Sequence, residues 1–134
     1  MNRITALMTC LALTGCVAAA SGKAAVLGAE FTLAPGESAS IEGSPLGVRF
    51  MAVTEDSRCP SDTTCVWAGE VRARVEIREG STAPQVVELQ LGGETSIGSH
   101  RVTLVRVEPQ PTTMPKIAVE QYRATLKVDR TSAR

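Results

Sequence analysis

Cysteine, histidine and tryptophan are the residue types of this chain best suited to redox chemistry, metal binding or partner recognition, and they are few. The sequence has four cysteines, one histidine and one tryptophan. Five residues separate Cys59 from Cys65, and Trp67 follows shortly after. Dithiol oxidoreductases favour Cys-x-x-Cys, and a zinc site would need two further ligands although His100 is the only histidine. The spacing favours neither a redox centre nor a metal site, and we expect no cofactor.

The segment Leu13–Cys16 has the residue types of a lipid-attachment signal. It follows a charged start at Arg3 and an apolar run over Ile4–Leu13. That run is too short to cross a membrane, since a spanning helix needs about 20 residues. The order branched apolar, small, glycine, cysteine resembles the lipobox of bacterial lipoproteins, which implies that residues 1–15 are a signal peptide and that Cys16 is acylated. Plain secretion after cleavage within Ala18–Ala20 is the alternative.

An acylated Cys16 predicts a protein held on a membrane by its lipid chains. Several acyl chains make the attachment stable, because each buried methylene adds about 0.8 kcal/mol. Val17 is not acidic. By resemblance to lipoproteins of bacteria with two membranes, this favours the periplasmic face of the outer membrane. The expected location is therefore the bacterial cell envelope, with the membrane as a partner.

One pair remains in the cysteine count once the signal and the lipid site are removed. Cys10 lies in the signal peptide and Cys16 carries lipid, which leaves Cys59 and Cys65. An exported domain folds in an oxidising compartment, so we expect a Cys59–Cys65 disulfide. So short a loop gains only about 2 kcal/mol from the cross-link. The bond is expected to fix the shape of a loop rather than to hold the domain together.

The flanks of this pair form a distinctive motif. Ser57–Pro60 has the order Ser-Arg-Cys-Pro, a short polar loop follows, and Cys65–Gly69 has the order Cys-Val-Trp-Ala-Gly. This skeleton resembles a pattern in small exported bacterial proteins of unknown function, many of them lipoproteins. The resemblance implies a shared β-rich domain, but it implies no activity, substrate or catalytic residue.

One interpretation of the motif is structural. Trp67 would pack over the disulfide or close the end of the fold, and Gly69 would let the chain turn into the next strand. Arg58 would pair with Asp56 or with Asp62 at the surface, a contact worth under about 1 kcal/mol. In this interpretation the motif stabilises a loop and has no partner.

The other interpretation is that the loop is a rigid probe for a partner. A disulfide-closed loop has lost its ordering entropy before binding, and tryptophan and arginine are favoured anchors at interfaces. The candidate binding residues are Arg58, Pro60, Asp62 and Trp67. Calcium bound by Glu55, Asp56 and Asp62 is a remote third interpretation, because the dense ligand spacing of a calcium loop is missing.

Two further groups of polar residues favour ordinary surface roles. Ser99 and His100 are adjacent, and adjacent residues of a strand point to opposite faces, so they are poorly placed as nucleophile and base. We expect His100 at a turn or at the start of a strand. A row of arginines at 72, 74 and 78 could contact an anionic polymer or a lipid headgroup. Glutamates at 70 and 76 interrupt the row, which favours a mixed-charge exposed face.

Hydrophobic periodicity predicts the elements that position these residues. Residues 71–78 alternate strictly between apolar and polar, the pattern of a half-buried antiparallel strand. Arg106 stands where an apolar residue is due, between the apolar Val105 and Val107, which predicts either a bulge or burial on both faces of the strand. Similar patterns give about seven strands, at 31–33, 38–41, 48–53, 71–77, 87–91, 102–107 and 122–128. We expect an all-β fold, a small antiparallel β-sandwich or a partly open barrel.

Length and charge are those of one small domain. Of 134 residues, about 119 remain after the signal, enough for a single core. We expect residues 16–28 to be a lipidated N-terminus and flexible linker, and residues 29–130 to be the domain. The 14 basic and 14 acidic residues balance, so nucleic acid is not an expected partner. Aromatic residues make up 3% of the chain, which predicts an aliphatic core.

The sequence thus predicts a bacterial envelope lipoprotein whose molecular role is binding. We find no catalytic constellation, so we do not expect an enzyme. The partner would be an envelope protein or a glycan. The alternative is an inhibitor of a secreted hydrolase, a protease or a lysozyme, acting through the Cys59–Cys65 loop.

Overall fold

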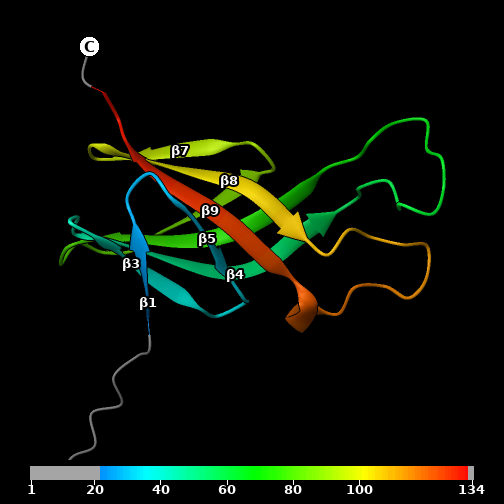
Figure 1. Cartoon of the computed structure of the whole chain (residues 1–134), viewed down its shortest axis with the longest axis horizontal. Helices are drawn as coiled ribbons and strands as arrows, with labels where there is room; N and C mark the ends of the chain where they lie inside the picture. The colour runs from blue at the N-terminus through cyan, green and yellow to red at the C-terminus, as the bar shows by residue number, and fades with distance from the viewer. Residues whose placement is uncertain (1–21, 133–134) are drawn as a thin grey trace, which may run out of the picture.

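Alternating side chains along the strands build two sheets that pack face to face (Figure 1). The computed structural model describes residues 22–132. The first sheet has the order β1 (Lys23–Val26), β3 (Ser38–Glu42), β4 (Leu46–Asp56), β5 (Val71–Glu79), β6 (Gln85–Gln90). The second has the order β2 (Glu30–Leu33), β9 (Arg123–Arg130), β8 (His100–Glu108), β7 (Glu94–Ile97). The predicted all-β sandwich is confirmed, with nine strands in the described part of the chain.

Neighbouring strands are antiparallel except β1 and β3, which pair in parallel. A single turn of 3₁₀ helix, η1 (Val119–Gln121), precedes β9. No helix within residues 22–132 is long and apolar enough to span a membrane.

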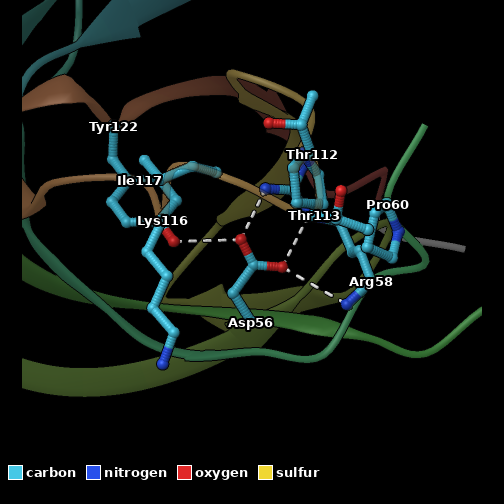
Figure 2. Close-up of a pocket in the computed structure, with 9 residues that line it drawn as sticks. Asp56, Arg58, Pro60, Thr112, Thr113, Lys116, Ile117 and Tyr122 are labelled. Atoms are coloured by element: carbon cyan, nitrogen blue, oxygen red, sulfur yellow. Dashed lines mark hydrogen bonds and ion pairs between the residues drawn. The ribbon is translucent and has the colours of Figure 1, made fainter. Parts of the chain in front are cut away.

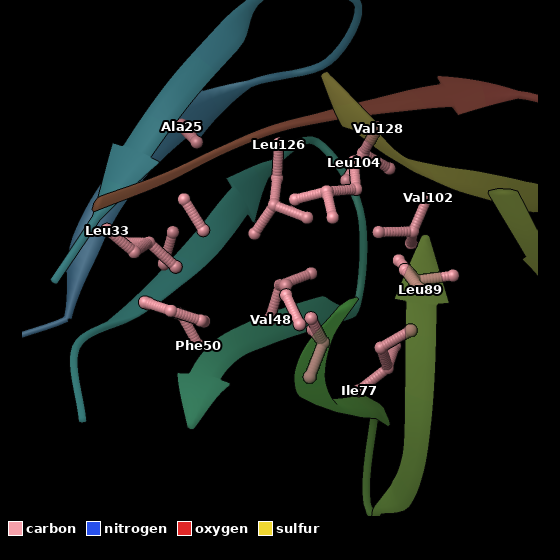
Figure 3. Close-up of a cluster of buried hydrophobic side chains, with 14 of the residues drawn as sticks. Ala25, Leu33, Val48, Phe50, Ile77, Leu89, Val102, Leu104, Leu126 and Val128 are labelled. Carbon is pink, nitrogen blue, oxygen red and sulfur yellow. The ribbon is translucent and has the colours of Figure 1, made fainter. Parts of the chain in front are cut away.

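The core lies between the sheets and is aliphatic, as predicted. The strictly alternating segment buries Val71, Ala73, Val75 and Ile77, each 1% exposed or less. Phe50 is the one fully buried aromatic side chain among the described residues. Figure 3 shows it with aliphatic side chains that come from both sheets. The sandwich is thus held mainly by burial of Val, Leu, Ile and Ala.

The first strand corrects the predicted linker. Lys23–Val26 is β1, not flexible chain, and Ala25 is only 4% exposed. Small alanines give a weak strand signal, and the strand exists because Ala25 pairs in register with Ile41 of β3. The domain therefore begins before residue 29. The predicted signal peptide and Cys16 lie outside the described residues.

The observed strands differ from the predicted ones in several details. β7 was not expected, and Leu91, expected to point inward, is 47% exposed because β6 ends at Gln90. Tyr122, expected to begin the last buried strand, is half-buried and precedes β9. Of the two alternatives predicted near Arg106, the structure selects the bulge, which is a register shift between β8 and β9.

The topology brings two long loops to one end of the sandwich. One loop, residues 57–70, joins β4 to β5 in the first sheet, and the other, residues 109–122, joins β8 to β9 in the second. We call these two segments together the double loop. Figure 1 shows them projecting from the same end, away from both described ends of the chain.

Candidate binding surface at the double loop

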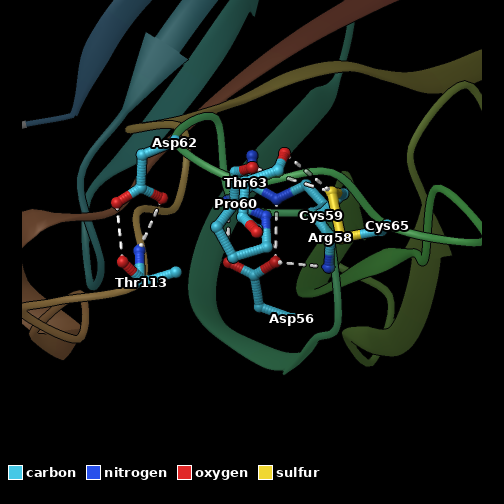
Figure 4. The surroundings of a disulfide bond; sticks show 8 residues. All are labelled: Asp56, Arg58, Cys59, Pro60, Asp62, Thr63, Cys65 and Thr113. Carbon is cyan, nitrogen blue, oxygen red and sulfur yellow. Dashed lines mark hydrogen bonds and ion pairs between the residues drawn. A yellow bond between two sulfur atoms is a disulfide. The ribbon is translucent and has the colours of Figure 1, made fainter.

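The predicted disulfide is present at the centre of the motif (Figure 4). Cys59 and Cys65 are bonded, with their Cα atoms 5.8 Å apart. Below the bond, the Ser57 N–H donates to the Glu70 carbonyl at 2.8 Å and the Cys59 N–H donates to the Ala68 carbonyl at 2.9 Å. The pairing of β4 with β5 therefore continues past the strand ends into the loop, which stiffens its base.

Gly69 is required at the point where this loop returns to the sheet. Its φ is +69°, a conformation that favours glycine. A Cβ atom at this position would overlap the carbonyl group of Ser57. The predicted turning role of Gly69 thus has two physical reasons, the left-handed backbone and the close approach of the facing chain.

Arg58 and Asp56 form a nearly buried ion pair at the root of the double loop. The guanidinium donates to Oδ1 through Nε at 2.8 Å and to Oδ2 through Nη2 at 2.7 Å. The two side chains are 8% and 11% exposed. Of the two partners that the sequence left open for Arg58, the structure selects Asp56. The contact is not the weak surface pair that was expected.

Tyr122 completes this pair from the other loop. Its hydroxyl donates to Oδ2 of Asp56 at 3.0 Å. Burial disfavours the charge on Asp56, but the hydrogen bonds from Arg58 and Tyr122 outweigh it and hold the pKa of Asp56 below its ordinary value. Burial, together with the nearby Asp56 carboxylate, raises the pKa of Tyr122 to about 12. Asp56 is thus ionised and Tyr122 protonated at neutral pH.

Arg58 also ties the two sheets together. Nη1 donates to the Val107 carbonyl at 2.8 Å, and Nη2 donates to the Pro109 carbonyl at 3.0 Å. Both carbonyls lie about fifty residues further along the chain, where β8 ends. Arg58 is therefore a clamp inside the double loop and is not available as a surface anchor.

Asp62 forms the second connection between the loops. Its carboxylate accepts the Thr113 N–H at 2.9 Å and the Thr113 hydroxyl at 2.6 Å (Figure 4). The Ser61 N–H donates to the Pro111 carbonyl at 2.9 Å beside it. The hydroxyl bond, then the N–H bond, lowers the pKa of Asp62. Disulfide, clamp and these contacts make the double loop one preformed unit.

The calcium interpretation does not fit these contacts. Asp56 faces Arg58, Asp62 faces Thr113, and Glu55 lies 3.5 Å from Arg72. Within residues 22–132 no three potential ligands gather to hold a metal ion. The three carboxylates have separate partners instead of a common centre.

Trp67 is exposed, contrary to the structural interpretation of the motif. Its side chain neither covers the disulfide nor closes the sandwich, because 76% of the residue remains accessible. Val66 beside it is fully exposed, and Met114 on the second loop is 77% exposed. The motif therefore separates into a buried clamp at Arg58 and exposed apolar side chains at its far end.

A pocket of about 450 Å³ lies between the two loops (Figure 2). Asp56, Arg58 and Tyr122 are among its lining residues. The remaining lining residues are Pro60, Pro111, Thr112, Thr113, Lys116 and Ile117. Because the polar atoms of Asp56, Arg58 and Tyr122 already have partners, the pocket offers prolines, an isoleucine and an exposed lysine to a partner rather than a free carboxylate or imidazole.

The single histidine lies elsewhere, at the start of β8, as predicted. His100 is 5% exposed, and its Nε2 lies 3.0 Å from the Ser44 hydroxyl. Its Nδ1 is buried without a hydrogen-bond partner among the described residues. A serine nucleophile needs a histidine that an acid orients, and the Ser44–His100 pair has no acid bonded to that nitrogen within residues 22–132.

All four binding residues predicted from the sequence lie in the double loop, but they have different roles there. Arg58 is buried, Pro60 lines the pocket, Asp62 joins the loops and Trp67 is exposed. Sequence reasoning missed the parts of the site that come from residues 107–122. No local signal could have found them, since they meet the motif only through the packing of the two sheets.

Comparison with protein-family models, curated proteins and solved structures found no match. The resemblance of the cysteine motif to small exported bacterial proteins therefore stays a prediction.

Proposed function

We propose that the protein is a non-enzymatic binding module of the bacterial envelope, held at the membrane by lipid on Cys16. Its partner, an envelope protein or a glycan, binds the double loop. In a host with two membranes the module sits on the periplasmic face of the outer membrane. The lipobox-like segment Leu13–Cys16 supports the anchor, and the geometry of the double loop supports the binding role.

The exposed Trp67 on a preformed loop is the observation that carries this proposal. Burying a tryptophan side chain removes roughly 150–250 Å² from water, worth about 4–6 kcal/mol at 25 cal/mol per Å² before opposing costs. The disulfide and the Asp62–Thr113 contact order the loop in advance, so little further entropy is lost on binding. An exposed tryptophan adds nothing to the stability of the fold, but its burial against a partner would add to the free energy of binding.

The arrangement of polar groups supports binding over catalysis. The Asp56 carboxylate accepts hydrogen bonds from Arg58 and from Tyr122, and the Tyr122 hydroxyl is used on Asp56. The buried His100 has no orienting acid among the described residues. An inhibitor of a secreted hydrolase is the more specific form of the proposal, favoured by the projection of residues 59–67 from the end of the sandwich.

A capture experiment tests the binding role. The full chain is immobilised and exposed to envelope extract, beside Trp67→Ala and the control Leu91→Ala. Leu91 is 47% exposed just after β6, so the control removes an exposed apolar side chain outside the double loop. We expect one partner to bind the parent chain and Leu91→Ala, and at least about thirtyfold weaker binding by Trp67→Ala.

The identity and activity of the captured partner separate the two forms of the proposal. A hydrolase that loses activity on binding supports inhibition, and a structural protein or glycan supports the general binding module. Equal capture by Trp67→Ala and the parent chain would show that the double loop is not the binding site.

A further inference from the structure

The outer face of the first sheet is hollowed at a glycine. Ser40, Gly47 and Arg78 lie opposite one another across β3, β4 and β5, so their side-chain positions share one face. Gly47 has no side chain, and a hollow of about 300 Å³ opens over it. A second hollow of about 240 Å³ shares the same three residues, so the two hollows adjoin. We name this feature the Gly47 trough and define it by Ser38, Ser40, Gly47, Arg49, Glu76 and Arg78.

The backbone does not explain why residue 47 is glycine. Gly47 is not among the glycines with positive φ, and the two register shifts of β4 come later, after Phe50 and after Val53. A Cβ atom at Gly47 would meet only the Ala39 carbonyl oxygen, at an ordinary 3.9 Å. Glycine weakens a strand, and within one it commonly marks a bulge or the close approach of another group. The absence of a bulge here points to the approach of a ligand.

The trough contains the two arginines of this face that lack an ion-pair partner in the described structure. Arg72 pairs with Glu70 and Arg74 pairs with Glu88, but no carboxylate lies within ion-pair distance of Arg49 or Arg78 among residues 22–132. Residues 1–21 contain no aspartate or glutamate. Glu76, opposite Arg49, is the carboxylate of the trough and offsets one of the two positive charges.

Two arginines and two serines around a hollow match the oxygens of a phosphate group. A guanidinium donates two parallel hydrogen bonds to phosphate oxygens, and serine hydroxyls can donate one each. Exposed valines flank the arginines on the edge strands of the same sheet, Val26 on β1 and Val86 on β6, at 56% and 54%. Cationic groups between apolar side chains fit the surface of a lipid layer.

The described chain begins beside this trough. Gly22 lies against it, because a Cβ on Gly22 would be 3.6 Å from the Ser38 hydroxyl oxygen and 3.8 Å from that of Ser40. Cys16 is six residues earlier, so the chain between them can span at most about 21 Å. A lipid on Cys16 would keep the trough that close to headgroups, and so short a tether makes even a weak contact effective.

We propose that the Gly47 trough binds the phosphate group of an anionic lipid in the membrane that carries the chain. This inference rests on the proposed lipid anchor. The outer face of the first sheet then lies on the membrane and the double loop projects alongside it, open to a partner.

Arginine footprinting on the membrane tests the contact. The full chain, acylated at Cys16, is reconstituted into vesicles of phosphatidylcholine alone or of equal parts phosphatidylcholine and phosphatidylglycerol. Arginines are modified with phenylglyoxal and quantified by mass spectrometry. We expect Arg49 and Arg78 to react about fivefold more slowly in the anionic vesicles. Arg106 on β8 of the second sheet should react equally in both.

Glycine substitution separates binding from stability. Gly47→Val fills the trough and suits a strand, so it should abolish the protection while the urea midpoint stays level or rises. Gly47→Ala, the milder change, should reduce the protection partly.

Three outcomes would overturn the inference. They are equal arginine reactivity in the two vesicle types, full protection that persists in Gly47→Val, and equal protection by inorganic phosphate in detergent without lipid. The last would assign the trough to a free anion. The acyl mass on Cys16 in the same sample tests the anchor separately, and the capture experiment tests the double loop.

Discussion

Removing Arg58 should be among the most damaging changes to this protein outside its core. Arg58→Ala leaves the Asp56 carboxylate with only Tyr122 as a side-chain donor, and it leaves the Val107 and Pro109 carbonyls without the guanidinium. Breaking a buried pair by removing one partner costs about 3–5 kcal/mol. The arginine and aspartate are 8% and 11% exposed, so we expect the lower end, about 3 kcal/mol.

Urea unfolding followed by circular dichroism measures this loss. With a slope of roughly 1–3 kcal/mol per molar urea, a loss of 3 kcal/mol lowers the midpoint by about 1–3 M. The pKa of Asp56 is lowered in the folded state from 3.8. Its contribution is therefore present above pH 3.8 and is lost as the pH falls through the folded pKa. Arg58→Ala should remove most of this acid-dependent loss.

Arg74→Ala is the matched control. Arg74 also pairs with a carboxylate, Glu88, but the two side chains are 46% and 41% exposed. Exposed pairs contribute under about 1 kcal/mol. If Arg58→Ala is no more destabilising than Arg74→Ala, then Arg58 does not clamp the double loop and the reasoning from burial is wrong.

Three further changes test other parts of the double loop. Gly69→Ala should destabilise the domain by about 3 kcal/mol or more in urea, because it combines positive φ with a backbone overlap; a loss under about 1 kcal/mol would contradict the geometry. Replacing Cys59 and Cys65 by alanine should cost about 2 kcal/mol and keep the sheet spectrum, since the core is elsewhere; complete unfolding would contradict a local role. Tyr122 contributes stability that is present below pH 10 and lost as the pH rises through about 12, so Tyr122→Phe should flatten alkaline unfolding between these values. An unchanged alkaline profile in Tyr122→Phe would refute the bond to Asp56.

Strands with strong alternation could be predicted because their signal is local. Every inward residue of β5 is buried as expected. The break in the apolar alternation at Arg106 coincides with the bulge in β8. Short strands could not be predicted in the same way. Lys23–Val26 and Glu94–Ile97 have four residues each, and they are strands because β3 and β8 supply their hydrogen-bond partners.

The candidate site could be predicted only in part, for a related reason. Its disulfide joins residues six apart, so the chain itself keeps the two sulfurs near each other. On the second loop, the partner of Arg58 is Pro109 and the partner of Asp62 is Thr113, and each lies 51 residues further along the chain. The local sequence around Arg58 and Asp62 does not indicate which backbone or side-chain groups of the second loop will contact them.

The sequence by itself determined the β class, the aliphatic core, the Cys59–Cys65 bond and the turn at Gly69, since each depends on residues near one another in the chain. Only the tertiary structure decided that Arg58 is buried and Trp67 exposed, although the two belong to one short motif. The physical reason is that burial depends on what packs against a side chain. The carbonyls at the end of β8 enclose Arg58, whereas Trp67 projects beyond the reach of either sheet.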